Sequence, residues 1–446
     1  MMPSFFSDNM VLQQQSSISI WGIASKKTWI KIVTSWNKKE YTTQSDDNGQ
    51  WKSTILTDKA GGPYQISISD GEEYTIGNVL LGEVWFCSGQ SNMEMPMRGF
   101  KNQPVLHSNE MLLDADDNNL RLFQSEKNAS VTPQNDVKGN WKISDAENAK
   151  EFSAVAFMYG LMLQKKLNVP VGIIVSCWGG TKIQSWMSKS SLVNAGYDVN
   201  FQSIDTAYEK HKQTTTLFNA MIAPFVGYGI KGYLWYQGES NRHEPSVYAK
   251  LFPEMVADWR KAWNAAHSLP FYYVQIAPYG GKDSTRSNRA IREVQLKSMK
   301  TIPNCGMVVT MDIGDETYIH FPDKKTVSDR LLYLALAKTY GYKGISYSGP
   351  LYKSMRTVND KINISFDYAE NGLSSFGKEL INFQIAGNDR VFYPAKASIE
   401  EDKTINVWSN DVKNPVAVRY AYKEYAKGDL YNTAGLPASS FRTDDW

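Results

Sequence analysis

The 446-residue sequence is poor in cysteine and histidine, and it contains no long apolar segment. Its three cysteines, Cys87, Cys177 and Cys305, are too few and too scattered for a disulfide framework, and none belongs to a Cys-x-x-Cys pair. No apolar run approaches the roughly 20 residues that a membrane helix needs. The N-terminus also lacks a basic region followed by a hydrophobic one. We therefore expect no membrane insertion, and either a cytosolic protein or one whose signal peptide was removed.

An excess of charge of one sign is also missing. The sequence has 48 Lys and Arg against 46 Asp and Glu, a formal net charge of +2, and no basic run. This excludes the electrostatic footprint of a nucleic-acid-binding protein and favours a neutral or mildly anionic small ligand. Aromatic residues are abundant instead, with 13 Trp and 25 Tyr. Such side chains suit sugar rings, and they also fill the cores of β-rich proteins.

The spacing of apolar residues divides the chain into three predicted domains. In residues 1–78, apolar and polar residues alternate with period two. Together with a predicted strand pair around Asn48-Gly49 and a predicted turn at Asp70-Gly71, this pattern predicts an N-terminal β-sandwich. In residues 79–348, apolar strands alternate with helical segments, which predicts an α/β domain with a parallel sheet covered by helices. Apolar and polar residues alternate again in residues 349–446, which predicts a β module followed by a tail. The polar stretch from 100 to 150 is interpreted as a long excursion near the site.

Several strands predicted in the α/β domain end in polar turns that contain glycine. These turns are 88–92, 178–181, 237–241 and 312–315. Because ligands of open α/β sheets bind at the carboxyl ends of the strands, the turns should converge on one site. Ser91 stands at the tip of the first turn, where a rigid strand end would present its hydroxyl as a nucleophile. Met93 rules out a Gly-x-Ser-x-Gly elbow, which disfavours the lipase-type hydrolase fold.

A serine nucleophile needs a base, and the sequence offers five histidines. His320 is the best candidate, because it follows a strand-ending turn and precedes a predicted helix, which places it at the same sheet edge as Ser91. His243 lies two residues after Asn241 and could touch substrate. The plain alternatives are a strand-ending turn at Ser91 and a structural hydrogen bond at His320.

Four blocks in this order resemble a known family. They are Ser-Gly-Gln-Ser-Asn-Met at 88–93, Trp-Gly-Gly-Thr at 178–181, Trp-Tyr-Gln-Gly-Glu-Ser-Asn at 235–241, and Asp-Ile-Gly-Asp at 312–315 followed by Ile319-His320. With the blocks at 6–13, 219–224 and 435–442, they make nearly the whole chain similar to the sialate O-acetylesterases, a branch of the SGNH hydrolases.

The resemblance implies an SGNH-type three-layer sandwich with accessory β modules, and it implies roles for individual residues. Ser91 would be the nucleophile, His320 the base, and the main-chain N–H of Gly179 or Gly180 and the amide of Asn241 the oxyanion donors. Glycine lets a carbonyl approach the main chain, and an Asn amide is a neutral donor, so the chemistry agrees. No metal or organic cofactor is implied. Relatives are often exported, which favours a secreted or periplasmic protein and leaves a cytoplasmic one open.

The acidic partner of His320 departs from the family pattern. The position three residues before the histidine, where SGNH enzymes commonly have Asp, is Thr317, and Tyr318 stands where many relatives have Asp. Asp312, Asp315 or Glu316 could orient the imidazole, with Asp315 or Glu316 favoured, or a backbone carbonyl could leave a Ser-His dyad.

Five polar residues are candidates for contact with substrate. Gln237 and Glu239 either hold their turn or reach substrate. Arg292 pairs either with a substrate carboxylate, such as that of sialic acid, or with a structural partner. The five are Gln90, Gln237, Glu239, His243 and Arg292.

The sequence thus predicts a serine esterase that removes O-acetyl groups from sugars through an acetyl-enzyme, with O-acetylated sialic acid as the expected substrate. Two alternatives remain at this point. One is an esterase for acetylated xylan or pectin, and the other is a carbohydrate-binding protein without catalysis.

Overall fold

The central element of the computed structural model, which describes residues 1–197, 209–265, 269–281 and 285–446, is a mostly parallel sheet. Its strand order is β13-β12-β11-β7-β10-β8-β9, and every pair in it except the antiparallel β8–β9 is parallel. This confirms the predicted α/β domain with a parallel sheet. The strands are β7 (Glu73–Gly89), β8 (Asp117–Gln124), β9 (Trp141–Ser144), β10 (Val171–Cys177), β11 (Gly232–Tyr236), β12 (Phe271–Val274) and β13 (Cys305–Val308).

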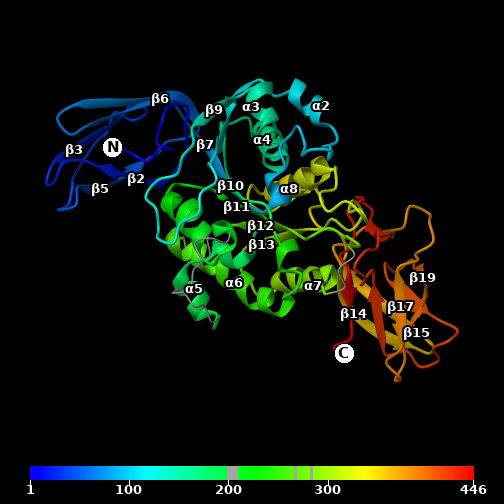
Figure 1. Ribbon diagram of the computed structural model, residues 1–446. Helices are drawn as coiled ribbons and strands as arrows, with labels where there is room; N and C mark the ends of the chain where they lie inside the picture. Colours follow the sequence, from blue (N-terminus) through cyan, green and yellow to red (C-terminus); the bar gives the residue numbers. More distant parts are fainter. Residues whose placement is uncertain (198–208, 266–268, 282–284) are drawn as a thin grey trace.

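Helices cover both faces of this sheet (Figure 1). On one face α4 (Ala154–Leu167) packs against α8 (Lys324–Lys338), and on the other α6 (Pro245–Ala262) packs against α7 (Asn288–Ser298). Successive side chains of a strand point to opposite faces, so Trp85 joins one apolar cluster and Phe86 the other. This explains why β10 and β11 are buried at every position.

Short helical segments connect the strands. The α-helices are α1 (Ser91–Glu94), α2 (Ser108–Leu113), α3 (Ala146–Lys150) and α5 (Lys189–Asn194). The remaining short segments are η1 (Ile183–Trp186), η2 (Lys210–Lys212), η3 (Phe218–Ile222), η4 (Ala223–Phe225) and η5 (Glu239–Asn241).

The N-terminal strands join the central sheet through β7. They are β1 (Val11–Gln13), β2 (Ser17–Ile23), β3 (Trp29–Thr34), β4 (Glu40–Gln44), β5 (Gln50–Leu56) and β6 (Gly61–Ser69). The first half of β7 pairs with β6, in a hairpin that turns at Asp70-Gly71 as predicted. Its second half pairs with β10 and β11, so residue 78, the predicted boundary, lies inside one continuous strand. The predicted strand pair around Asn48-Gly49 is wrong, because β4 pairs with β3 whereas β5 pairs with β2 in a separate sheet.

The stretch from 100 to 150 is more ordered than its polarity indicates. It contains β8, which pairs in parallel with β10 inside the central sheet, and β9. Only Leu120 to Phe123 of β8 are buried, and the polar residues before them conceal the strand in the sequence.

The C-terminal residues form further antiparallel sheets at the end of the molecule opposite the N-terminal strands (Figure 1). Their strand orders are β14-β15-β20-β19, β18-β17-β21-β23 and β16-β22. The strands are β14 (Leu351–Val358), β15 (Lys361–Asp367), β16 (Leu373–Ser374), β17 (Phe383–Ala386), β18 (Phe392–Pro394), β19 (Lys396–Ile399), β20 (Ile405–Trp408), β21 (Ala417–Tyr420), β22 (Tyr431–Asn432) and β23 (Phe441–Arg442).

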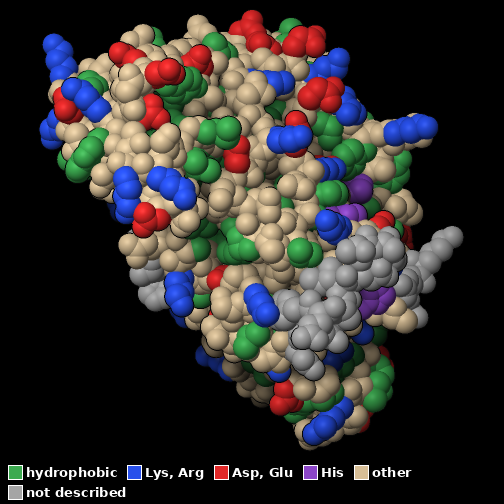
Figure 2. Space-filling model, turned by 60° about the vertical axis from the view of Figure 1, so that its left-hand side comes forward, with side chains coloured by type: hydrophobic (Ala, Val, Ile, Leu, Met, Phe, Trp, Pro, Cys, Tyr) green, Lys and Arg blue, Asp and Glu red, His purple; other side chains and the backbone are tan. Residues whose placement is uncertain are grey.

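Acidic and basic side chains are interspersed on the face that Figure 2 displays, without a continuous basic patch. Within the described residues, none of the helices has both the length and the apolar character required to cross a bilayer.

Candidate active site

Three neighbouring strands end at the same level of the sheet and bring their turns together. Gly89 of β7 aligns with Cys177 of β10 and with Tyr236 of β11. Gly89 has a φ of +141°, and a Cβ there would lie 2.1 Å from the Tyr236 carbonyl oxygen, so only glycine permits this close approach. The chain then turns into α1, whose first residue is Ser91. The predicted turns at 88–92, 178–181 and 237–241 therefore converge on one cavity, whereas no residue of the fourth turn, 312–315, lines it, and that segment contributes Ile319 and His320 instead.

Ser91 and His320 lie in hydrogen-bond contact, with 2.8 Å between Ser91 Oγ and His320 Nε2. The other ring nitrogen, Nδ1, lies 2.7 Å from the side-chain oxygen Oε1 of Gln103. Because an amide oxygen only accepts, Nδ1 carries the proton and Nε2 accepts from the Ser91 hydroxyl. Burial, assisted by the positive charge of Lys324, lowers the pKa of His320 to about 4. The imidazole is thus neutral at pH 7 and able to accept a proton.

The structure does not bring the predicted acids to this histidine. Asp315 Oδ1 accepts from the backbone N–H groups of Thr317 and Tyr318 within its own loop, and these bonds lower its pKa. Glu316 has an exposed side chain. Asp312 forms a two-pronged ion pair with Arg330 at 2.6 and 2.8 Å. A glutamine amide, which the sequence analysis did not consider, takes the position predicted for an acid.

The predicted oxyanion donors differ in their availability. The Gly179 N–H donates to Glu94 Oε2 at 2.5 Å, and Lys127 holds the other oxygen of that carboxylate at 2.5 Å. Gly180 has a φ of +73° and open space where a Cβ would stand. Ser91, as the first residue of α1, has an N–H without a partner within the helix.

Asn241 does not present its amide to the cavity, contrary to the prediction. It is fully buried, and its Nδ2 group donates to Gln184 Oε1 at 2.9 Å and to Glu244 Oε1 at 3.0 Å. Its oxygen accepts from the backbone N–H of Ile183. Both amide hydrogens are engaged, so Asn241 fastens the turns around the site together.

Beneath Ser91, one amide joins two buried charges. Asn92 Nδ2 donates to Glu239 Oε1, and Asn92 Oδ1 accepts from Lys324 Nζ, each at 2.6 Å. Burial raises the pKa of Glu239 and lowers that of Lys324 to about 7. No role was predicted for either residue, although Asn92 directly follows Ser91 and Lys324 lies four residues after His320.

The five candidates for substrate contact separate into two groups. Gln90, Glu239 and His243 line the cavity around Ser91. Gln237 does not, because it is fully buried and its Nε2 donates to Thr181 O and Asn241 Oδ1. Arg292 is also fully buried, and it binds the Lys423 and Glu424 carbonyls and Ser440 Oγ far along the chain. Arg292 therefore has a structural role, which was the alternative to binding a substrate carboxylate.

The cavity around Ser91 has a volume of about 870 Å³ and is rich in cationic side chains. Arg242 is the most buried of these, at 4% exposure. It donates from Nε to the Glu239 carbonyl at 2.7 Å and from Nη1 to Asn288 Oδ1 at 3.4 Å, and no carboxylate of the described residues forms an ion pair with it. The cationic lining residues are Lys127, Lys182, Lys212, Arg242 and Arg286.

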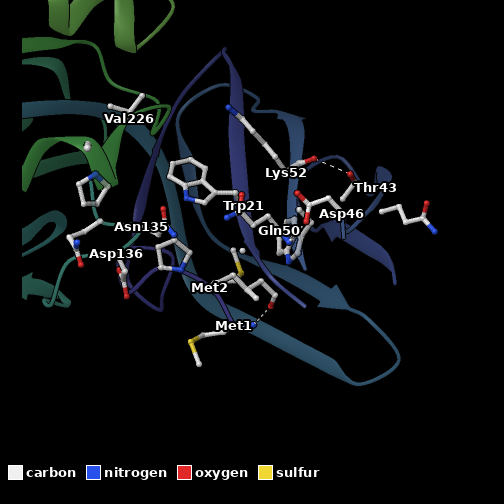
Figure 3. A pocket seen from close by; sticks show the side chains of 18 residues that line it. Met1, Met2, Trp21, Thr43, Asp46, Gln50, Lys52, Asn135, Asp136 and Val226 are labelled. Carbon is white, nitrogen blue, oxygen red and sulfur yellow. Dashed lines mark hydrogen bonds between the residues drawn. The ribbon is translucent and has the colours of Figure 1, made fainter. Parts of the chain in front are cut away.

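A second cavity, of about 480 Å³, lies between the N-terminal strands and the segments 134–136 and 223–226. Figure 3 shows Trp21, Lys52 and Asp46 facing it from one side and Asn135 and Asp136 from the other. None of its described lining residues is a histidine or a cysteine. It therefore lacks the nucleophile and base that meet in the first cavity.

A serine hydroxyl in contact with a neutral histidine at the carboxyl edge of a parallel sheet defines a hydrolase of the serine esterase class. Comparison with known proteins narrows the class. The chain belongs to the carbohydrate esterase family described as sialic acid-specific acetylesterases, whose model matches residues 81–340.

Individual relatives extend this similarity over the whole chain. Sialate O-acetylesterase from Homo sapiens is 28% identical over 492 residues, which covers 98% of this chain and 91% of that protein. The protein of the same name from Mus musculus is also 28% identical, covering 98% and 93%. A solved carbohydrate acetylesterase from Xanthomonas citri is 34% identical, covers 100% of both chains, and superposes with a TM-score of 0.90.

Proposed function

We propose that this protein, with an SGNH-type three-layer catalytic domain, removes O-acetyl groups from sugars by a Ser-His mechanism through an acetyl-enzyme. The observation that carries the proposal is the 2.8 Å contact between Ser91 Oγ and His320 Nε2 at the strand ends. Membership of an esterase family and an overall match to a carbohydrate acetylesterase support it.

The reaction begins with attack of Ser91 Oγ on the acetyl carbonyl carbon while His320 Nε2 takes the hydroxyl proton. The oxyanion is held by the N–H groups of Ser91 and Gly180, whereas the N–H of Gly179 is engaged by Glu94. Each such donor is worth about 3 kcal/mol of transition-state stabilisation. His320 then gives its proton to the departing sugar oxygen. Water attacks the acetyl-enzyme with His320 as base, which releases acetate and restores Ser91.

The favoured substrate is an O-acetylated sialic acid. Curated relatives carry the name sialate O-acetylesterase, and the buried guanidinium of Arg242 in the cavity wall has no carboxylate partner among the described residues. The charges of Glu239 and Glu424 act on this guanidinium without a direct ion pair, and a carboxylate of the sugar would supply one. Acetylated xylan or pectin is the alternative substrate, because its neutral sugars share the ester chemistry.

Replacing Ser91 by Ala tests the proposed function. The variant should lose hydrolysis of p-nitrophenyl acetate, since no hydroxyl remains to attack. It should keep the Tm of the parent, because the substitution removes only one oxygen atom at the cavity wall. A fluorophosphonate probe should label the parent and leave the variant unlabelled, since only an activated serine reacts. Full esterase activity of the Ser91→Ala variant would refute the assignment.

A further inference from the structure

The segment that carries Gln103 is built as a tight turn against the catalytic histidine. The Gln103 N–H donates to the Phe100 carbonyl at 2.9 Å, and the Leu106 N–H donates to the Pro322 carbonyl at 3.0 Å, two residues after His320. Gly99 has a φ of +78°, and a Cβ there would lie 2.2 Å from the Gln103 carbonyl oxygen. The turn is therefore fixed by its own backbone and fastened to the histidine segment.

Both ends of this turn touch the imidazole. The Phe100 ring packs edge-on against the His320 ring with 5.3 Å between centroids, and Gln103 Oε1 lies 2.7 Å from Nδ1. Gln103 is not among the residues that line the cavity. Its side chain thus reaches the back of the histidine, on the side away from Ser91 and substrate.

We propose that Gln103 is the positioning residue of His320. Its Oε1 accepts the Nδ1 hydrogen, which fixes the tautomer with a free Nε2 and aims that nitrogen at Ser91 Oγ. A carboxylate does this in the Ser-His-Asp arrangement, whereas here a neutral amide does it. The inference rests on the proposed function and assigns a role that the predicted acids do not fill.

The neutral partner has an electrostatic consequence. A carboxylate behind the ring would stabilise the imidazolium, whereas an amide oxygen contributes only a dipole. Of the charged groups near the ring, Lys324 on α8 disfavours its protonation, and the carboxylates of Glu94 and Glu239 line the cavity beyond Ser91. The imidazole should therefore stay unprotonated well below pH 6, and kcat/KM should be level from about pH 5 to about pH 6, because the pKa of His320 is lowered to about 4 and Lys324, with a pKa lowered to about 7, keeps its charge in this range.

The variant Gln103→Glu tests the role through the pH profile of p-nitrophenyl acetate hydrolysis. A carboxylate at this position favours the protonated ring and raises the pKa of His320, so the acid limb of kcat/KM should move up by about 1 to 3 pH units. Asn102→Asp is the matched control, since it adds the same charge at the neighbouring position, which is exposed, whereas the Nδ1 partner of the ring is Gln103. An acid limb of Gln103→Glu that coincides with those of the parent and of Asn102→Asp would overturn the proposal.

The variant Gln103→Ala tests the same role without adding charge. With the hydrogen bond gone, the ring can rotate or change tautomer, so kcat should fall about tenfold or more while KM stays unchanged. Circular dichroism and Tm show whether each variant is folded. Unchanged kcat of folded Gln103→Ala would contradict the assignment. These tests can fail separately from the Ser91→Ala test. If the proposed function itself is wrong, the Ser91→Ala variant keeps its esterase activity. If only the role of Gln103 is wrong, Ser91→Ala is inactive and the Gln103 variants behave like the parent.

Discussion

Asn92, the residue after the nucleophile, joins a buried carboxylate to a buried ammonium. A buried charge without a partner is costly, and here one amide supplies an acceptor to Lys324 and a donor to Glu239. Its Nδ2 also donates to the carbonyl of Ile319, the residue before His320, at 3.2 Å. A single side chain thus ties together the segments that carry Ser91, His320 and Glu239, and the geometry of the dyad depends on it.

Arg242 is expected to set the preference for an acidic sugar. Replacing it by Gln removes a charged donor that a substrate carboxylate would bind, so KM for 9-O-acetyl sialic acid should rise about 10-fold or more, since hydrogen bonds to charged groups contribute about 1.5 to 3 kcal/mol. Hydrolysis of p-nitrophenyl acetate, which has no carboxylate, should not change and also reports that the variant is folded. Acetate release measured with both esters provides the comparison.

Arg289→Gln is the control for Arg242, because Arg289 lies outside the cavity and pairs with Glu424 at 3.4 Å. Equal losses on the charged and the neutral ester would contradict carboxylate recognition. Faster acetate release from acetylxylan than from 9-O-acetyl sialic acid would instead favour the polysaccharide alternative.

At the scale of single residues, the site residues that follow strand ends could be predicted from the sequence. Those that reach the site from other segments could not. Ser91 follows β7 and His320 follows β13, whose carboxyl ends lie at the same edge of the parallel sheet, so topology places both residues at that edge. Gln103 lies in an aperiodic stretch, and nothing in its neighbours indicates that Gly99 turns the chain back onto the histidine. Asn241 was misassigned for a related reason: position in a strand-ending turn does not reveal that Gln184 and Glu244 engage its amide.

At the scale of elements, β7 links the N-terminal sheet to the nucleophile. We expect Gly89→Ala to destabilise the protein by about 3 kcal/mol, because the new methyl group would lie 2.1 Å from the Tyr236 carbonyl oxygen and push β11 away from β7. Urea unfolding followed by tryptophan fluorescence measures the change. Gly71→Ala is the control, since no atom lies within 4 Å of its added methyl group, although its φ of +121° also strains an alanine. A Gly89→Ala variant as stable as Gly71→Ala would show that the strand end can relax.

Elements were predicted best where one kind of periodicity ran unbroken. The predicted alternation of helical segments and apolar strands is clear at α4 and β10, where most residues of the helix and every residue of the strand are buried. Periodicity did not reveal β8, because only half of that strand is buried. It also predicted the wrong strand pair around Asn48-Gly49, because a sharp turn there connects strands of two sheets. Pairing partners depend on packing between sheets, which a local pattern does not contain.

At the scale of the whole molecule, α7 joins the catalytic domain to the C-terminal strands. Arg292 on its buried side binds the carbonyls of Lys423 and Glu424, and Glu293 accepts from Tyr422 Oη at 2.6 Å and from Arg442 Nε at 2.9 Å. The C-terminal residues therefore provide acceptors for a fully buried guanidinium of the catalytic domain, and the two parts should unfold together.

Arg292→Met tests this coupling. The substitution removes the hydrogen bonds from the fully buried guanidinium to the part-buried carbonyl groups of Lys423 and Glu424, so the free energy of unfolding should fall by about 3 kcal/mol. Arg289→Met, one turn earlier on the exposed side of the same helix, should change it by about 0.5 kcal/mol or less. If the domains are coupled, urea unfolding of Arg292→Met remains a single transition at a lower midpoint, and esterase activity at low urea matches that of the parent because Arg292 lies outside the cavity. A variant with the stability of Arg289→Met would mean that the hydrogen bonds of Arg292 to the C-terminal residues do not stabilise the catalytic domain.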